Sequence, residues 1–205
     1  MIKYILFLVA FNICNHSIAQ ERKLVYDVVR NGKVIGEINF VEISQGQKKF
    51  LSMNSNVETT VIIPIKDHTA ETTGFNKGIM VYSSFYQKQT GSDEVKKTTT
   101  ISGKKYKATN NGESKLINLP SVRYNTLMLY TNVPANINKV FSGNFQQMLD
   151  IKKIAENKYR LMLPEGKVND YTYKNGICTK VEIVRSMGTV QFVLREEKTG
   201  TMINK

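Results

Sequence analysis

The sequence predicts an all-β protein made mainly of antiparallel strands. Short runs rich in Val, Ile, Thr, Tyr and Phe recur along the chain, and turn residues, chiefly Asn and Gly, separate them. Within several runs apolar and polar residues alternate, as they do in a strand with one buried face. We count about ten candidate strands, and sheets of that size curl or split instead of staying open. We therefore expect a single strongly curved sheet or an open barrel.

The first residues have the pattern of a secretory signal peptide, which we place at residues 1–19. Lys3 precedes an apolar run over residues 4–13, which is shorter than the ~20 residues of a membrane-spanning helix. The triplet that ends at Ala19 has small residues at its first and third positions, so cleavage is expected after Ala19. Cys14 lacks the small preceding residues of a lipid-attachment site, and a lipoprotein anchor is the minor alternative.

Residues 20–205 have the length of one domain, so we predict a single β-rich domain after the signal peptide. No later run is apolar for long enough to span a membrane, and we expect an exported protein in the periplasm or outside the cell. One cysteine, Cys178, remains in this domain, so no disulfide is expected within the chain. We expect Cys178 to be a small buried side chain and not a reactive thiol.

The first hairpin is the clearest element. Leu24–Arg30 and Val34–Ser44 are strand-like, and Asn31 with Gly32 between them readily adopts the positive φ angles of a tight turn. The stretch is not a dinucleotide fingerprint, because strand-like residues follow Gly36. It is not a P-loop either, because Asp27 stands where that motif requires a glycine.

Similar turns are predicted at 76–78, at 110–112 and at Asn175 with Gly176. After the last of these, alternate residues are expected to share the buried face of a strand: Ile177, Thr179, Val181 and Ile183. The opposite face would carry Cys178, Lys180 and Glu182. The first hairpin also has apolar residues on its second face, which then requires a cover such as a helix, a loop, a second sheet or a ligand.

One segment departs from the strand pattern. Between Pro120 and Pro134, apolar residues fall mainly at spacings of three and four, and Ser121 is a candidate N-cap. We predict one short helix over residues 122–131 that docks against the sheet. A weaker helix candidate covers residues 142–149, which suit a loop and a strand start equally well.

The chain is basic, with a formal net charge of +12. Its lysines are spread along the sequence in pairs, with no arginine-rich helix and no long basic block, so a solvated surface explains the charge as well as an anion site does. The motifs of nucleic-acid-binding domains are absent, and an exported protein is a poor candidate for that role. The expected partners are a lipid, a glycolipid or another envelope protein.

The candidate ligand-binding residues are Tyr159, Asn169, Tyr171, Tyr173 and Lys174. Tyrosines two residues apart on one strand face can stack on a sugar ring or line an amphipathic pocket, and the nearby lysine adds an anionic preference. The alternative is ordinary cross-strand packing of these rings.

Catalytic and metal sites are not predicted. A Ser-His-acid triad would require His68, which has Asp67 beside it, but no nucleophile-elbow motif supports it. No pair of carboxylates is singled out by spacing, and no EF-hand loop is present. Residues 20–205 contain one histidine and one cysteine, which cannot form a structural zinc site. We expect no cofactor.

Several segments resemble a family of exported bacterial β-rich proteins that is classed as a domain of unknown function. The segments are LYTNVP (129–134), NKVFSGNFQQML (138–149) and YRLMLPEGKVNDYTYKNG (159–176). The pattern Y-x-V-x-x-N-G-K-x-I-G at 26–36 is similar to the start of that family and of other exported half-barrel domains. The resemblance implies a curved antiparallel sheet and brings no assigned reaction or catalytic residues.

The functional prediction is a non-enzymatic envelope protein that binds an apolar or amphipathic, lipid-like ligand in its curled sheet. The alternative is a protein-interaction or structural module of the cell envelope. A hydrolase is the distant third option, and the oligomeric state stays open.

Overall fold

The computed structural model describes residues 18–60, 64–185 and 188–202. Most of the predicted signal peptide, residues 1–17, lies outside the described residues. The described chain forms fourteen strands and two short 3-10 helices, η1 and η2. The elements are β1 (Ala19–Arg30), β2 (Lys33–Gln45), β3 (Lys48–Thr60), β4 (Pro64–Asn76), β5 (Ile79–Gln89), β6 (Val95–Ser102), β7 (Lys105–Asn110), β8 (Glu113–Ile117), η1 (Thr126–Tyr130), β9 (Lys139–Ser142), β10 (Gln147–Ala155), β11 (Lys158–Met162), η2 (Pro164–Gly166), β12 (Val168–Lys174), β13 (Ile177–Arg185) and β14 (Gly188–Met202).

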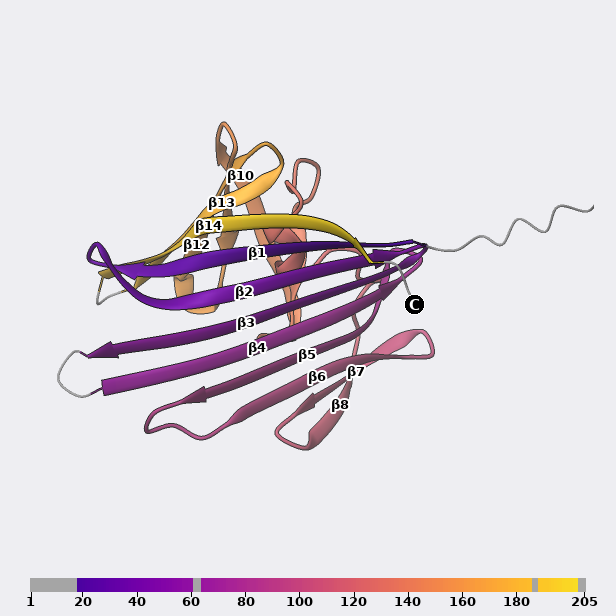
Figure 1. Cartoon of the computed structure of the whole chain (residues 1–205). Helices are drawn as coiled ribbons and strands as arrows, with labels where there is room; N and C mark the ends of the chain where they lie inside the picture. Colours follow the sequence, from indigo (N-terminus) through magenta and orange to yellow (C-terminus); the bar gives the residue numbers. More distant parts are fainter. Residues whose placement is uncertain (1–17, 61–63, 186–187, 203–205) are drawn as a thin grey trace, which may run out of the picture.

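All fourteen strands belong to one antiparallel sheet, and neighbours in the sheet are almost always neighbours along the chain. The exception joins the two ends: β1 pairs with β14 from Ala19 opposite Met202 to Arg30 opposite Val190. The sheet therefore runs from β8 to β1 and then from β14 back to β9, with β8 and β9 as its edges. Figure 1 shows a curved layer of long strands, β1–β5, with the shorter strands β10–β13 standing across it.

The predicted all-β antiparallel class and the single curved sheet are confirmed, but the expected count of about ten strands is too low. Strands β8, β9 and β11 have five, four and five residues. Such short strands show too little alternation of apolar and polar residues to be recognised one by one.

The turns predicted from Asn and Gly are present. Asn31 and Gly32 join β1 to β2 with φ angles of 51° and 75°. Two successive positive φ angles define a type I′ turn, whose twist matches that of the flanking strands. Asn175 and Gly176 make the same kind of turn between β12 and β13. The predicted turns at 76–78 and 110–112 likewise join β4 to β5 and β7 to β8.

The interior of the curved sheet is the hydrophobic core. Leu24, Tyr26 and Val28 of β1 are buried, while the residues between them are only half-buried. This period of two places alternate side chains on opposite faces of the strand. Ile38 and Phe40 of β2 extend the same buried face. The half-buried outer positions agree with the two-sided apolar pattern of the first hairpin.

The chain between β8 and β9, residues 118–138, fills much of this interior. Its buried side chains include Val122, Tyr124, Leu127, Leu129 and Tyr130, and the polar Asn125 and Thr131 are buried as well. The Met80 N–H of β5 donates to the carbonyl of Val122 at 2.8 Å, and the Phe141 N–H of β9 donates to the carbonyl of Tyr124 at 2.9 Å. The segment thus bridges strands that are far apart in the sheet, and the core is packed by the chain itself.

The predicted docked helix at 122–131 is wrong. Only a 3-10 helix, Thr126–Tyr130, forms there, and its N-cap is Asn125 instead of Ser121. The carbonyls of Val122 and Tyr124 accept hydrogen bonds from strands, so the backbone of residues 122–125 serves tertiary contacts. An α-helix would need these carbonyls for its own bonds. The weaker candidate at 142–149 is the end of β9, a turn and the start of β10.

Part of the interior beside β4–β6 is polar. Glu71, Thr73, Ser83 and Thr99 are all buried there, next to core residues such as Phe75 and Met80. Asn125 donates from Nδ2 to Oγ1 of Thr73 at 2.8 Å, which ties η1 to β4.

The turn between β9 and β10 closes onto this polar surface. The backbone N–H of Gly143 bonds to the carboxyl group of Glu71. Lys97 donates to the carbonyl of Asn144 at 2.6 Å. Gln146 donates from Nε2 to the carbonyl of Thr98 at 2.8 Å. Hydrogen bonds therefore hold this turn inside the curved sheet.

The expected alternation in the last hairpin is broken at Cys178. A register shift between Thr172 and Tyr173 leaves Cys178 opposite the buried Tyr173, while Lys180 is opposite Thr172. Such a bulge lets two side chains near each other in sequence point to the same face. Cys178 is fully buried as expected of a small side chain, but not on the face shared by Lys180 and Glu182.

Candidate functional site

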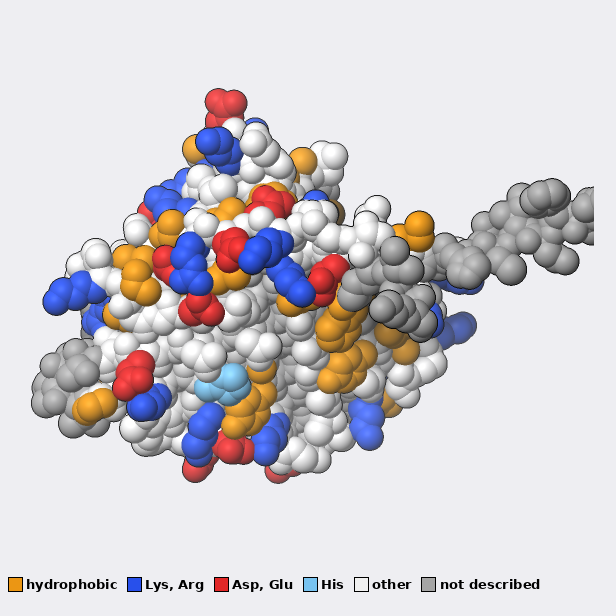
Figure 2. Space-filling model, viewed as in Figure 1, with side chains coloured by type: hydrophobic (Ala, Val, Ile, Leu, Met, Phe, Trp, Pro, Cys, Tyr) orange, Lys and Arg blue, Asp and Glu red, His pale blue; other side chains and the backbone are white. Residues whose placement is uncertain are grey.

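A groove of about 900 Å³ lies at the end of the sheet where the β1–β2 and β5–β6 hairpins turn. It crosses β2–β5 and reaches β14. Its lining comprises Val34, Ile35, Gly36, Glu37, Asn56, Val57, Glu58, Lys66, Asp67, His68, Lys88, Gln89, Thr90, Gly91, Ser92, Asp93 and Arg195. Figure 2 shows the outer face of these strands, with positive and negative side chains interspersed. A groove of this volume is within the range of small-molecule sites.

The strand register brings four polar side chains into one row across the groove. Glu37 is opposite Asn56, Asn56 is opposite His68, and His68 is opposite Lys88. None of the four is buried. Nδ1 of His68 lies 2.8 Å from Oδ1 of Asn56, a hydrogen bond between β3 and β4. These residues are distant in sequence, so only the pairing of β2–β5 assembles the row.

Arg195 of β14 closes one end of this row. It donates to Oδ1 of Asp27 at 2.6 Å and also binds the carboxylate of Glu37. Hydrogen bonds from Asn39 and from Arg195 hold the pKa of Glu37 below its ordinary value. Glu37 is therefore ionised at neutral pH, and Arg195 neutralises its charge.

Lysines from β4 and β5 occupy the other end. Lys66 lies 3.4 Å from Glu58, a pair between exposed side chains. Lys88 forms no ion pair with any residue that the structure describes. Across the lining, three Lys or Arg stand beside four Asp or Glu. This near balance suits a zwitterionic or neutral polar group better than a simple anion.

An aromatic pair borders the groove. The rings of His68 and Tyr86 have centroids 5.8 Å apart, and Lys96 lies 5.8 Å from the Tyr86 ring centroid. The Tyr86 hydroxyl donates to Glu94 at 3.2 Å. The two rings are tilted by 57° and both stay partly exposed, so either one can contact a ring of a ligand.

The groove lining also includes three apolar residues, Val34, Ile35 and Val57. Ile35 and Val57 pack against the core, whereas Val34 is 61% exposed. The exposed Val34 therefore adds an apolar contact to a lining that is otherwise mainly polar.

His68 and Asp67 do not form a catalytic pair. Neighbouring residues of a strand point to opposite faces. Asp67 instead accepts hydrogen bonds from Thr69 at 2.9 Å and from Gln87 at 2.8 Å. His68 lies on the outer face with Asn56. The arrangement offers no acid to orient the imidazole as a general base.

The structure places the predicted ligand-binding tyrosines in the core. Tyr159, Tyr171 and Tyr173 are each at most 5% exposed. Tyr159 and Tyr173 make an edge contact with centroids 5.7 Å apart, and the Tyr173 hydroxyl donates to the carbonyl of Leu129 at 2.8 Å. Tyr159 is directly opposite Tyr171, so cross-strand packing accounts for these rings. Their binding of a ligand stays a prediction.

Asn169 and Lys174 lie apart from each other. Oδ1 of Asn169 is buried and has no hydrogen-bond partner among the described residues. Lys174 is exposed beside the β12–β13 turn, in a different hollow lined also by Arg22 and Glu197. The five predicted residues therefore do not form one surface site.

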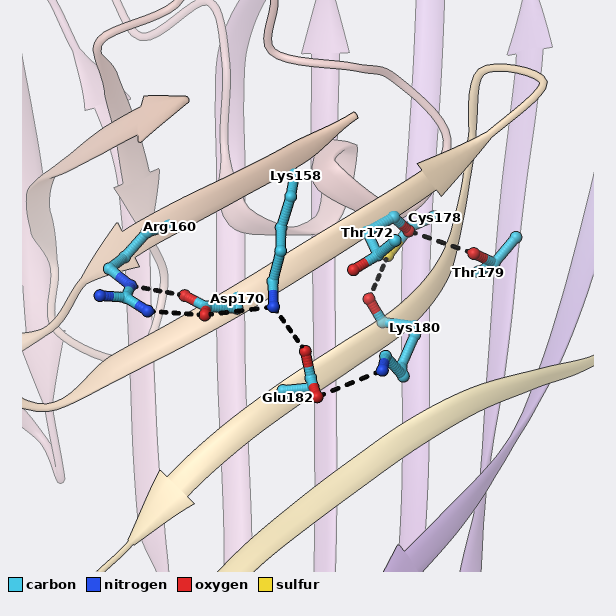
Figure 3. A network of polar contacts seen from close by, with 8 residues as sticks. All are labelled: Lys158, Arg160, Asp170, Thr172, Cys178, Thr179, Lys180 and Glu182. Atoms are coloured by element: carbon cyan, nitrogen blue, oxygen red, sulfur yellow. Dashed lines mark hydrogen bonds and ion pairs between the residues drawn. The ribbon is translucent and has the colours of Figure 1, made fainter. Parts of the chain in front are cut away.

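The outer face of β11–β13 carries a dense ion-pair network, shown in Figure 3. Arg160 binds both carboxylate oxygens of Asp170, at 2.7 and 2.8 Å. Lys158 lies 2.8 Å from Glu182, and Lys180 lies 3.2 Å from it. The hydrogen bonds from Arg160 hold the pKa of Asp170 below its ordinary value. Because these charges already satisfy one another, this face is a weaker binding candidate than the groove.

Cys178 lies beneath this network. Its thiol donates to the carbonyl of Lys180 at 3.4 Å, and burial raises the pKa of the thiol to about 12. A thiol that stays protonated is a poor nucleophile.

Within the described residues, no three His, Cys, Asp or Glu side chains are grouped as metal ligands require. The same part of the chain holds no helix with the length and hydropathy of a membrane-spanning segment.

Sequence reasoning missed the groove. His68 was considered alone, and Glu37, Asn56, Lys88 and Arg195 have the pattern of an ordinary solvated strand face. The available signal was Val34 beside the first turn, an apolar residue that the structure leaves exposed.

The described chain is a barrel-like domain made of one unclosed antiparallel sheet. Its interior is filled by side chains, and its surface carries a groove. Residues 26–195 match the model of the family described as "Domain of unknown function (DUF6134)". The chain belongs to that family, which confirms the resemblance to a domain of unknown function.

The chain is also similar to a solved structure described as a beta-barrel-like protein of the domain of unknown function DUF1849 from Brucella abortus. The identity is 9% and the TM-score is 0.46, with 89% of this chain and 97% of the other covered. No curated protein matches the chain.

Proposed function

We propose that this protein is a non-enzymatic, exported envelope protein that binds an amphipathic molecule with a zwitterionic or neutral polar head group in the groove across β2–β5. The observation that carries the proposal is the lining, which combines the exposed Val34 with balanced charges around His68 and Lys88. The interior of the sheet is a poorer candidate, because buried residues of 118–138 occupy it.

The geometry suggests how such a molecule would lie. An acyl chain or other apolar part would cover the exposed Val34, which water contacts in the free protein. The polar head would reach the row of Asn56, His68 and Lys88, where hydrogen-bond donors and the unpaired ammonium of Lys88 are available. No covalent step is implied, because no acid orients His68.

Native mass spectrometry of the protein purified from its own envelope fraction tests the proposal. We expect a co-purifying amphipathic molecule of lipid-like mass. A stoichiometric protein partner with no small molecule would contradict the proposal and favour the interaction module.

Titration with defined probes localises the site. Lysophosphatidylethanolamine below its micelle concentration should bind more tightly than lysophosphatidylglycerol. The double variant His68→Ala with Lys88→Ala should weaken binding about thirtyfold, since it removes two polar contacts worth roughly 1 kcal/mol each. The matched control, Lys152→Ala with Lys153→Ala, changes exposed lysines of β10 outside the groove and should leave binding unchanged. Equal effects of both pairs would contradict a site in the groove.

A protein-interaction module is the second candidate, and edge strand β8 favours it. Strand β8 pairs only with β7, and Leu116 on it is 62% exposed. An open strand edge can accept a strand from another protein. A complex that is lost on Leu116→Lys, with the groove variant unaffected, would support this alternative.

A further inference from the structure

The hairpin turns at the two ends of the sheet differ in charge. Three turns, β2–β3, β4–β5 and β6–β7, lie at the end where Ala19 pairs with Met202. Their segments 45–48, 76–79 and 102–105 contain lysines and no Asp or Glu. The described turns at the opposite end carry acidic residues as well, namely Asp93, Glu94 and Glu113. The end with both termini is therefore the basic end.

A hollow of about 590 Å³ lies between two of the basic turns. The Lys77 N–H donates to the carbonyl of Gln47 at 2.9 Å, which holds the β4–β5 turn against the β2–β3 turn. The hollow is lined by Ser44, Gly46, Gln47, Lys48, Lys49, Phe75, Lys77, Gly78, Arg123 and Met128. Four of these are Lys or Arg, and none is Asp or Glu.

Most of this positive charge is uncompensated. Lys49 is paired with Glu42 at 2.8 Å. Lys48, Lys77 and Arg123 form no ion pair with any residue that the structure describes. Three unpaired cations around one hollow repel each other, and an anion between them would relieve that repulsion.

An apolar hollow of about 410 Å³ adjoins the cationic one and shares Lys48 and Lys49 with it. Its lining includes Ile43, Phe50 and Val81, and Phe50 is 42% exposed. Figure 2 shows hydrophobic side chains gathered near this end of the sheet. Cationic and apolar surfaces side by side match the boundary between head groups and acyl chains.

We infer that this basic end docks on a membrane surface that contains anionic phospholipid. A lipid phosphate lies in the hollow among Lys48, Lys77 and Arg123, and Phe50 enters the acyl boundary. Charge complementarity selects this occupant, because the unpaired groups are all cations and the apolar side chains lie beside them. The groove across β2–β5 is at the opposite end of the strands and faces away from that membrane. The inference does not depend on the groove.

Vesicle sedimentation tests this docking. The exported protein is mixed with vesicles of phosphatidylcholine alone or with phosphatidylglycerol added. We expect binding that requires phosphatidylglycerol and weakens as salt is raised. The double variant Lys48→Glu with Lys77→Glu should lower binding at least about tenfold, since each lysine near an anionic surface contributes roughly 1 kcal/mol. Phe50→Ser should lower binding without changing its dependence on salt.

The matched control is Lys33→Glu with Lys115→Glu, which makes the same change in net charge at exposed positions away from the hollow. It should keep binding within about twofold of the parent protein. Equal losses in both double variants would show a non-specific effect of net charge and overturn the inference. Saturable binding of inorganic phosphate without any binding to vesicles that contain phosphatidylglycerol would make the hollow a site for a soluble anion, which also overturns it. Because every variant carries the same N-terminal residues, differences between them report on the turns.

Discussion

The interior of the sheet is packed by different chemistry where η1 meets β1, β2 and β12 and where the β9–β10 turn meets β4–β6. On the first side, Tyr130 contacts Tyr26 and stacks on Phe40, in both cases with ring centroids 5.3 Å apart. It also meets Tyr171 edge to face at 6.4 Å. On the second side, the buried carboxyl group of Glu71 accepts hydrogen bonds from the Thr126 hydroxyl at 3.4 Å and from the Gly143 N–H.

This difference in chemistry suggests that the two sides stabilise the fold in different ways. Burial of aromatic surface contributes much of the free energy of folding. It does little to fix how the buried groups are oriented, because the hydrophobic effect depends on area. A buried polar group is stable only when its partner is in place, so it selects one arrangement of the chain. We therefore expect the aromatic side to supply more of the stability, and the polar side to position η1 and the β9–β10 turn.

The largest effect should come from the aromatic side. Tyr130→Ala removes a ring that contacts Tyr26, Phe40 and Tyr171. We expect the free energy of unfolding to fall by about 3–5 kcal/mol, as for other large-to-small changes of core aromatics. Urea unfolding followed by circular dichroism measures the loss. A loss below about 1 kcal/mol would show that the aromatic side is not the main source of stability.

A pH titration sharpens the role of the polar side. Burial raises the pKa of Glu71 from 4.5 to about 7. Between these values the folded protein keeps a proton that the unfolded chain has lost, so the free energy of unfolding falls as pH rises. The expected contribution of Glu71 over this window is about 3 kcal/mol, after which it levels off.

Glu71→Gln is the control for that titration, because an amide has no proton to lose. Its urea midpoint should vary less than that of the parent protein between pH 4.5 and 7. The parent and variant curves should converge toward low pH. Parallel curves across the window would show that another group causes the pH dependence.

The contact between Gly143 and the polar side leaves no room for a side chain. A Cβ at Gly143 would stand 2.7 Å from Oε1 of Glu71 and 2.8 Å from Oγ of Ser83. We expect Gly143→Ala to destabilise the protein by about 1–3 kcal/mol, the usual cost of overpacking. Gly200→Ala is the matched control, because nothing lies within 4 Å of its added Cβ. Equal midpoints for the two variants would mean that the β9–β10 turn moves away at little cost.

The smallest effect should come from the outer part of the same turn. Gln146 donates to the carbonyls of Thr98 and Thr109 and to the hydroxyl of Thr99. Because Gln146 is only half-buried, water can replace part of what Gln146→Ala removes. We expect a loss of about 1 kcal/mol, measured by the same urea unfolding. If Gln146→Ala lowered the free energy of unfolding as much as Tyr130→Ala does, the polar side would contribute as much stability as the aromatic side, contrary to expectation.

Local signals in the sequence predicted much of the fold. Asn31 with Gly32 and Asn175 with Gly176 act within two residues, so the turns they form are readable without the rest of the chain. The alternation in β1 and β11 likewise reflects a strand with one buried face. The family resemblance was also visible, because it rests on these turn and strand residues.

The helix at 122–131 and the face of Cys178 could not be predicted in the same way. The spacing in 122–131 fits a helix, but hydrogen bonds from Met80 and Phe141 take the carbonyls that a helix needs. The bulge opposite Tyr173 moves Cys178 to the inner face through the pairing of β12 with β13. Both outcomes depend on partners that are distant in the sequence or on the register between strands.

The sequence by itself determined the antiparallel class, the tight turns and the basic charge of this protein, because each follows from residues close together or from composition. The tertiary structure decided which side chains meet. The row from Glu37 to Lys88, the hollow among Lys48, Lys77 and Arg123, and the burial of Glu71 all arise from strand register and from the path of residues 118–138. Register is set by pairing energies summed over the whole sheet, so no short stretch of the chain encodes these sites.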